Sequence, residues 1–96
     1  MAKLQDYQKR FVAEYYQLEE RVIKLRSLIA KAHAGELEFA LICPIVLLTY
    51  QLDFMTDYLK MLIIRSFKEQ IELSYSDEIR DIYLTAITDD QMKNYE

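Results

Sequence analysis

Three polar residues of one predicted helix carry side chains suited to ligand binding: Gln51, Tyr58 and Arg65. They are seven residues apart, so they follow one helix face. An arginine guanidinium binds a phosphate or carboxylate with two hydrogen bonds, and a tyrosine ring stacks on a base. A glutamine amide reads an amide-like edge. The spacing therefore predicts a face that binds a phosphate-bearing ligand.

A second polar line belongs to an earlier predicted helix. Its members step by four, three, four and three residues: Arg10, Glu14, Gln17, Arg21 and Lys24. If the two lines meet, they build a polar cleft with an excess of positive charge. We then expect these ligand-binding residues: Arg10, Arg21, Lys24, Gln51, Tyr58 and Arg65. An ordinary structural interpretation stays open, in which Arg65 pairs with Glu14 or another acid and Tyr58 lies at the rim of a helix pair.

Catalytic signatures are missing from the chain. It has one histidine and one cysteine, with no H-E-x-x-H pair and no glycine-rich phosphate loop. The carboxylates of Asp53 and Asp57 are interpreted as solvated surface acids. His33 is interpreted as a helix-end residue, and Cys43 as a small apolar one. We therefore expect no enzyme, no cofactor and no metal site.

Composition favours a single all-α domain over residues 1–96. The chain is 52% hydrophobic and 29% charged, which is the composition of a folding chain, and it has one glycine and one proline. The net charge of −4 argues against general nucleic-acid binding. The longest apolar run, residues 39–48, is too short to span a bilayer, and no signal-peptide core is present. With a lone cysteine, these features indicate a cytoplasmic protein.

Hydrophobic periodicity predicts three helices, over about residues 5–34, 44–73 and 77–88. In the first, Phe11, Tyr15, Leu18, Val22, Leu25 and Ile29 recur at steps of four and three. In the second, the stripe is Ile45, Leu48, Leu52, Met55, Leu59 and Leu62. Gly35 ends the first helix and Pro44 suits the first turn of the second, so the two form an antiparallel hairpin.

Further apolar residues flank the stripe of the second helix. Together with the stripe, these flanking residues make the helix apolar over more than the roughly 100° arc that one partner covers: Leu47, Phe54, Tyr58, Met61 and Ile64. We therefore expect a homo-oligomeric helical bundle. The relative direction of neighbouring hairpins and the docking of the third helix stay open.

The hairpin resembles a family of small uncharacterised phage and prophage proteins first catalogued in crAss-like phages. The resemblance covers about residues 7–67 and depends on the run YQKRFVAEYYQLEERVIKLRSLI, followed by CPIVLLTYQLDFMTDYLKMLIIR. Its matching positions are Arg10, Glu14, Leu18, Leu25, Leu48, Gln51, Leu52, Met55, Tyr58, Leu59, Leu62 and Arg65. The tail from Glu69 onward departs from this hairpin pattern.

The resemblance implies a phage protein in the cytoplasm of an infected bacterium. Small phage accessory proteins of this kind are often counter-defence factors, and some are oligomeric sponges for the cyclic or ADP-ribose-type nucleotides of immune signalling. The leading hypothesis is a non-enzymatic viral sequestration protein of that type. Two alternatives stay open: an interaction module that inhibits a host or defence protein through its acidic second half, and a structural phage protein.

Overall fold

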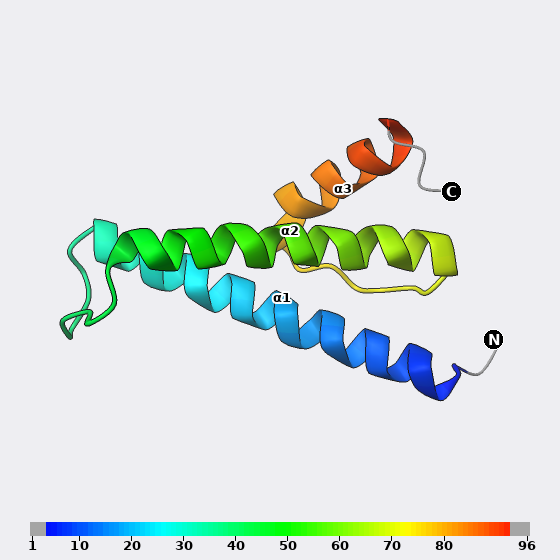
Figure 1. Cartoon of the computed structure of the whole chain (residues 1–96), viewed down its shortest axis with the longest axis horizontal. Coiled ribbons are helices and arrows are strands. Elements are labelled where there is room, and N and C mark those ends of the chain that lie inside the picture. The colour runs from blue at the N-terminus through cyan, green and yellow to red at the C-terminus, as the bar shows by residue number, and fades with distance from the viewer. Residues whose placement is uncertain (1–3, 93–96) are drawn as a thin grey trace.

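The chain folds as an antiparallel hairpin of two long helices with a short third helix packed on one side (Figure 1). The computed structural model describes residues 4–92. Helix α1 spans Asp6–His33, α2 spans Ile45–Glu69, and α3 spans Arg80–Met92 after a 3₁₀ turn, η1, at Asp77–Ile79. The described residues include no strand, so the predicted all-α class and helix order are confirmed. Within these residues no helix is long and apolar enough to cross a membrane.

The core lies between α1 and α2, and the third helix closes it from a second side. The predicted stripe of α1 is buried except for Leu25, which is partly buried. Of the stripe predicted for α2 only Leu59 and Leu62 are buried, and Ile64, expected on a flanking face, is buried because the chain after α2 packs on that side as well. The buried cluster contains Phe11, Tyr15, Leu18 and Val22 from α1, Leu59, Leu62, Ile63 and Ile64 from α2, Ile71 and Ile79 from the chain between α2 and α3, and Ile82 and Ala86 from α3.

Helix α1 ends as the sequence predicts. Gly35 adopts a left-handed conformation with φ of 70°, which costs glycine no steric energy. The Gly35 N–H donates to the Ala32 carbonyl over 3.2 Å, and the Glu36 N–H donates to the Lys31 carbonyl over 2.9 Å. These two bonds form a Schellman motif. Helix α2 begins directly after Pro44, so this proline precedes the first turn instead of lying within it.

The predicted end of the second helix near Leu73 is wrong, because α2 ends at Glu69. Gln70 has a φ of 56° and reverses the chain, and the Ile71 N–H donates to the Ser66 carbonyl over 2.9 Å. Ile71 is then buried in the core. The left-handed conformation costs a non-glycine residue about 1–2 kcal/mol. Because glutamine and not glycine occupies position 70, no glycine marks this turn in the sequence.

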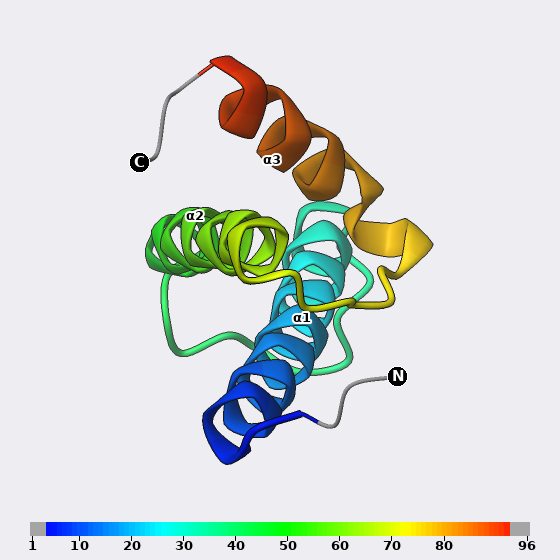
Figure 2. The ribbon, with the colours of Figure 1, turned by 90° about the vertical axis from the view of Figure 1, so that its right-hand side faces the viewer.

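The segment of residues 70–76 returns along the hairpin and lies against α1 (Figure 2). The Tyr16 hydroxyl accepts a hydrogen bond from the Ser74 N–H over 2.8 Å. The Glu19 carboxylate accepts one from the Tyr15 hydroxyl over 2.6 Å and one from the Ser76 N–H over 3.3 Å. Burial, with the hydrogen bond to Glu19, raises the pKa of the Tyr15 phenol. Side chains of α1 therefore accept hydrogen bonds from backbone N–H groups of this segment that have no secondary-structure partner.

The third helix starts and ends differently from the expectation. Ser76 caps it, since its hydroxyl accepts from the Glu78 N–H over 3.3 Å, but the first turn is the 3₁₀ turn η1. The α-helix then begins at Arg80 and runs past the expected end at residue 88 to Met92.

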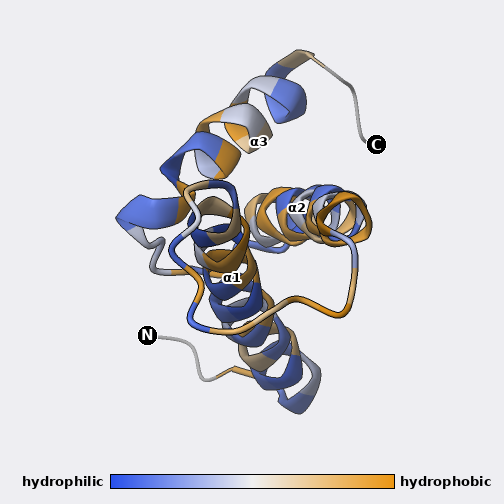
Figure 3. Ribbon diagram, turned by 90° about the vertical axis from the view of Figure 1, so that its left-hand side faces the viewer, coloured by the Kyte–Doolittle hydropathy of each residue, from blue (hydrophilic) through white to orange (hydrophobic). Residues whose placement is uncertain are grey.

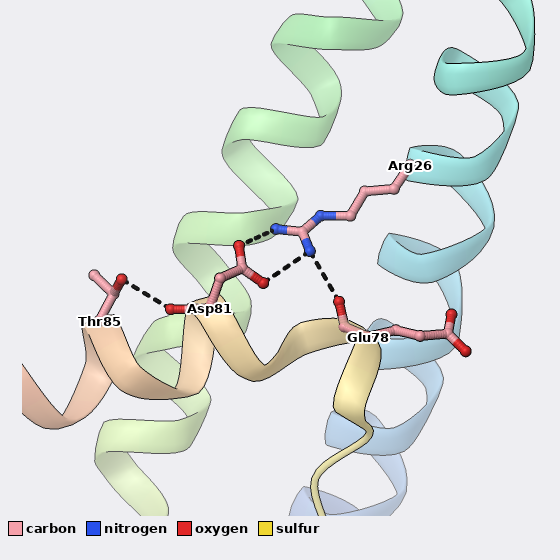
Figure 4. Close-up of polar contacts among 4 residues, drawn as sticks. All are labelled: Arg26, Glu78, Asp81 and Thr85. Carbon is pink, nitrogen blue, oxygen red and sulfur yellow. Dashed lines mark hydrogen bonds and ion pairs between the residues drawn. The ribbon is translucent and has the colours of Figure 1, made fainter.

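Ion pairs attach α3 to both hairpin helices. The Arg26 guanidinium of α1 donates to both carboxylate oxygens of Asp81, over 3.0 and 2.8 Å, and to the Glu78 carbonyl over 3.1 Å (Figure 4). Figure 4 also shows Thr85, whose hydroxyl donates to the Asp81 carbonyl. At the far end of α3, Asp89 pairs with Lys60 of α2 over 2.8 Å. The pairs fix the direction in which α3 crosses the hairpin.

The core seam makes a direct stability prediction. Leu59→Ala removes a side chain with 0% exposure and should lower the free energy of unfolding by about 2–5 kcal/mol in a urea titration. Leu84→Ala on α3 is the matched control, because Leu84 is 50% exposed and should lose well under 1 kcal/mol. Equal losses for the two variants would contradict this packing of the hairpin.

The Arg26–Asp81 pair makes a pH prediction. Hydrogen bonds from Arg26 hold the pKa of the Asp81 carboxyl below its usual range. A carboxyl with a lowered folded pKa adds stability above its unfolded pKa of about 3.9 and loses it as the pH falls through the folded value. A double-mutant cycle of Arg26→Met and Asp81→Asn should give a coupling of about 1 kcal/mol at pH 7 that fades below pH 4. A coupling that does not change with pH would show that charge contributes nothing to it.

Candidate functional site

The two predicted polar lines meet at one contact between the hairpin helices. The Tyr58 hydroxyl of α2 donates a hydrogen bond to the Glu14 carboxylate of α1. Because the helices are antiparallel, two turns after Glu14 in α1 correspond to two turns before Tyr58 in α2. Arg21 and Gln51 therefore come to matching heights on the same side. The predicted juxtaposition of the two lines therefore exists at Glu14 and Tyr58, and the bond belongs to the ordinary structural interpretation as much as to a binding site.

Tyr58 has an altered titration because of this contact. The hydrogen bond to the Glu14 carboxylate, with a smaller desolvation effect, raises the pKa of the Tyr58 phenol. The phenol is thus neutral at physiological pH and keeps a proton to donate. Tyr58 as a whole is 47% exposed, so part of the residue is accessible to a stacking partner.

Arg65 lies two turns after Tyr58 on the same face, toward the C-terminal end of α2. Its guanidinium carbon lies 4.7 Å from the centre of the Phe11 ring of α1, a cation–π distance. Its Nη2 and Nε atoms contact a Glu69 carboxylate oxygen over 3.1 and 3.2 Å. This pair joins residues one turn apart on an exposed surface, and such pairs are weak. A ligand anion can therefore replace Glu69 at Arg65 at little cost.

The remaining predicted residues are exposed and lie along α1 and α2. Arg10 directly precedes Phe11, so it belongs to the Arg65 end of the face. Arg21 and Gln51 are exposed further along the hairpin. Lys24 forms a surface pair with Glu20 over 2.7 Å. The structure thus places all six residues on the hairpin without gathering them into one closed cleft.

A feature of this face that the candidate residue set left out is an exposed apolar stripe on α2. Its members step by three, four, four and three residues, and we call them the α2 stripe: Leu47, Tyr50, Phe54, Tyr58 and Met61. At about 100° per residue they fall within one narrow arc. Phe54 in its middle is 75% exposed. Figure 3 also shows hydrophobic residues in the α1–α2 loop and at the start of α2, and Phe39, Ile42 and Val46 there are exposed. The sequence shows apolar residues on the flanking faces of α2, but only their burial in the structure shows which of them are exposed and which belong to the core.

Helix α2 therefore has three faces with different surroundings. One packs on α1 through residues such as Leu59 and Leu62, and a second packs on α3, for example through Lys60 and Asp89. Figure 2 shows that α2 also has a side turned away from α3. This third side carries the exposed α2 stripe, of which Tyr58 contacts α1 through Glu14. We call this third side, with the polar line of α1 beside it, the open face. The return segment and α3 leave the open face uncovered.

A shallow pocket lies away from this face, where the end of α1 meets the loop. It has a volume of about 470 Å³ and is lined by Lys24, Ser27, Leu28, Lys31 and residues 36–39. The size suits a small ligand. Two lysines meet Glu36 and Glu38 there, so the lining has no net charge to attract an anion. Only Lys24 of the predicted residues belongs to it.

The fold defines a small helical-hairpin protein with an exposed polar and apolar face. Its described residues hold no group of three or more histidine, cysteine and acidic side chains placed for a metal ion. The chain belongs to the Sequestin family, whose model matches residues 5–67. These residues are α1, the loop and nearly all of α2, without the return segment and α3. The family name points to sequestration of another molecule. No curated protein and no solved structure matches the chain.

The Tyr58–Glu14 contact can be tested by titration. Glu14→Gln removes the negative charge that raises the Tyr58 pKa, so the pKa should fall toward the usual value of about 10. Labelling of tyrosine ring carbons and NMR resolves the individual phenols. Glu20→Gln is the control, because Glu20 pairs with Lys24 and should leave Tyr58 unchanged. A Tyr58 pKa that stays the same in Glu14→Gln would remove Glu14 as its cause.

Proposed function

We propose that this protein is a non-enzymatic phage counter-defence factor that sequesters a nucleotide immune signal of the cyclic or ADP-ribose type. The observation that carries the proposal is the Sequestin match over residues 5–67, which covers the six candidate residues and the open face. Sequestration needs a binding surface and no reacting group. The hairpin offers such a surface without help from α3.

The chemistry of the open face supports a phosphate-bearing ligand. Arg10 and Arg65 lie at one end of the hairpin, and Arg21 and Lys24 lie nearer its middle. The pairs that now hold Arg65 and Lys24 are exposed and join residues one turn apart, so phosphate oxygens compete with them readily. Tyr58 supplies an open ring for a base. The arginines and the lysine give this face a local positive charge, whereas the whole chain has a net charge of −4. This combination favours a small anionic ligand over a long nucleic acid.

The setting follows from the resemblance of the hairpin to small phage proteins. In this proposal the protein acts in the cytoplasm of the infected bacterium and lowers the free concentration of a signal that a host defence produces. Each binding site removes one signal molecule from solution, so the concentration of binding sites must exceed that of the signal. The protein transforms nothing and needs no cofactor.

Arg65→Ala should separate binding from folding. Loss of a charged hydrogen-bond donor should weaken the affinity for a nucleotide roughly 10- to 100-fold, measured by calorimetry with cyclic dinucleotides and cyclic ADP-ribose as probes. Arg80→Ala is the matched control, since Arg80 is an exposed arginine at the start of α3, outside the family match. Equal affinities of both variants and the original chain would remove Arg65 from the site.

Native mass spectrometry identifies the ligand class. The protein is purified from cells with an active nucleotide-signalling defence and from cells without it. An added mass of several hundred daltons in the first sample alone supports sequestration. Absence of added mass in both samples, with no probe bound, overturns the proposal.

A second candidate function is inhibition of a host or defence protein. The exposed α2 stripe favours it, because a contiguous apolar surface typically contacts another protein. Recovery of one host protein at a fixed ratio, with no nucleotide bound, would select this function.

A further inference from the structure

We propose that Glu69 is an internal competitor for the ligand at Arg65, and that its carboxylate sets how tightly this chain holds a phosphate-bearing molecule. This inference rests on the proposed function, because it names a residue that regulates the same site. It depends on three observations: the geometry of the Arg65–Glu69 pair, the position of Glu69 at the end of α2, and the location of Glu69 outside the residues that the family model matches.

The carboxylate of Glu69 occupies one edge of the Arg65 guanidinium. Arg65 Nη2 and Nε both contact the same carboxylate oxygen, Oε2, over 3.1 and 3.2 Å. A guanidinium binds an anion most tightly when two parallel N–H groups each reach a separate oxygen. Glu69 supplies one oxygen to both nitrogens, whereas a phosphate supplies two oxygens to the same edge. A phosphate therefore forms a hydrogen-bond geometry at Arg65 that Glu69 does not provide.

Arg65 keeps its position when Glu69 leaves, because α1 supports the guanidinium from a second side. The guanidinium carbon of Arg65 lies 4.7 Å from the centre of the Phe11 ring, and Phe11 is only 6% exposed. A buried ring is fixed by its neighbours, so the cation–π contact holds the arginine without an acid. Exchange of Glu69 for a ligand anion thus needs a rotation of the Glu69 side chain and no change in the helix pair.

Glu69 lies where a negative charge does not stabilise the helix. It is the last residue of α2, and the partial negative charge at the C-terminus of a helix repels an acid. The order of the pair is also the weaker one, since an acid four residues before a base stabilises a helix more than the reverse order does. A residue that breaks local rules in this way is typical of a functional position. The contact with Arg65 is the role that the structure offers for it.

The turn after α2 holds Glu69 at this place. The N–H groups of Gln70 and Ile71 both donate to the Ser66 carbonyl, and buried Ile71 anchors the turn. The Glu69 side chain is 30% exposed and that of Arg65 is 55% exposed, so the acid is the more sheltered member of the pair. The family match ends at residue 67, before Glu69 and the turn. The competitor therefore adjusts the affinity of this chain without a change in the matched binding residues.

Glu69→Gln tests the competition. This variant keeps the size of the side chain and removes its charge, so a ligand no longer displaces a carboxylate from Arg65. The dissociation constants for pyrophosphate and for cyclic ADP-ribose should fall about three- to tenfold, measured by NMR titration of the Arg65 Nε–H signal. Glu72→Gln is the matched control, because Glu72 is an exposed acid of the return segment and its loss changes the net charge by the same amount. An equal gain in both variants, or no gain in Glu69→Gln, overturns the proposal.

A variant without the guanidinium shows whether the gain acts through Arg65. Pyrophosphate binding to Arg65→Ala is measured by calorimetry, alone and combined with Glu69→Gln. The combined variant should bind no more tightly than Arg65→Ala combined with Glu72→Gln, since no guanidinium is left to release. A full gain in the Arg65→Ala background would show that Glu69 repels the anion by charge alone, and it would overturn the competition at Arg65.

Thermal unfolding separates this role from a role in folding. Glu69→Gln should melt at the temperature of the original chain or slightly above it, because an acid is removed from the C-terminal end of α2. Circular dichroism at 222 nm follows the helices. A clearly lower melting temperature would show that Glu69 serves the fold, which overturns the proposal.

The two proposals fail separately, because pyrophosphate has the phosphate chemistry of the ligand without a base or ribose. Tighter pyrophosphate binding by Glu69→Gln, with no nucleotide bound by any variant, overturns only the proposed function. Nucleotide binding that Glu69→Gln leaves unchanged overturns only the competition.

Discussion

The contact between the apolar faces of α1 and α2 is the constraint on which the rest of the structure depends. Isolated helices of this length are only marginally stable in water, and their stability comes from burying a common face. Once Val22 and Leu59 are buried in that seam, the antiparallel register is set. This register brings Tyr58 to Glu14 and Arg65 to Phe11, so the geometry of the candidate site is a consequence of core packing.

The third helix packs on this hairpin but contributes no residue to the open face. Its return segment satisfies its polar groups on Tyr16 and Glu19, and Arg26 holds its start. All of these contacts lie away from the α2 stripe. The family match ends at residue 67, before the return segment begins. Helix α3 therefore reads as an addition that stabilises the hairpin and leaves the shared surface free.

The open face combines two properties that rarely coexist on a free surface. It has an apolar stripe, which favours contact with protein, and arginines beside it, which favour contact with anions. Exposed pairs such as Arg65–Glu69 keep the cations in place until a stronger anion arrives.

The sequence by itself determined the helical class, the hairpin and most of the core, because periodicity of 3.6 residues and a terminal glycine are local signals. It also placed Glu14 and Tyr58 on two polar lines whose meeting the sequence left open, and the structure joins the lines at these two residues. It missed the turn at Gln70, since a polar residue takes a left-handed conformation there only when burial of Ile71 compensates.

Only the tertiary structure decided which apolar residues of α2 are core and which are surface. Leu59 and Phe54 have the same character in the sequence, and the positions of α1 and α3 alone bury one and leave the other exposed. The same holds for the charges. Arg26 and Arg21 are one residue type on one helix, but packing directs the first to Asp81 and leaves the second on the open face. Burial is a property of neighbours distant in the chain, which no local pattern specifies.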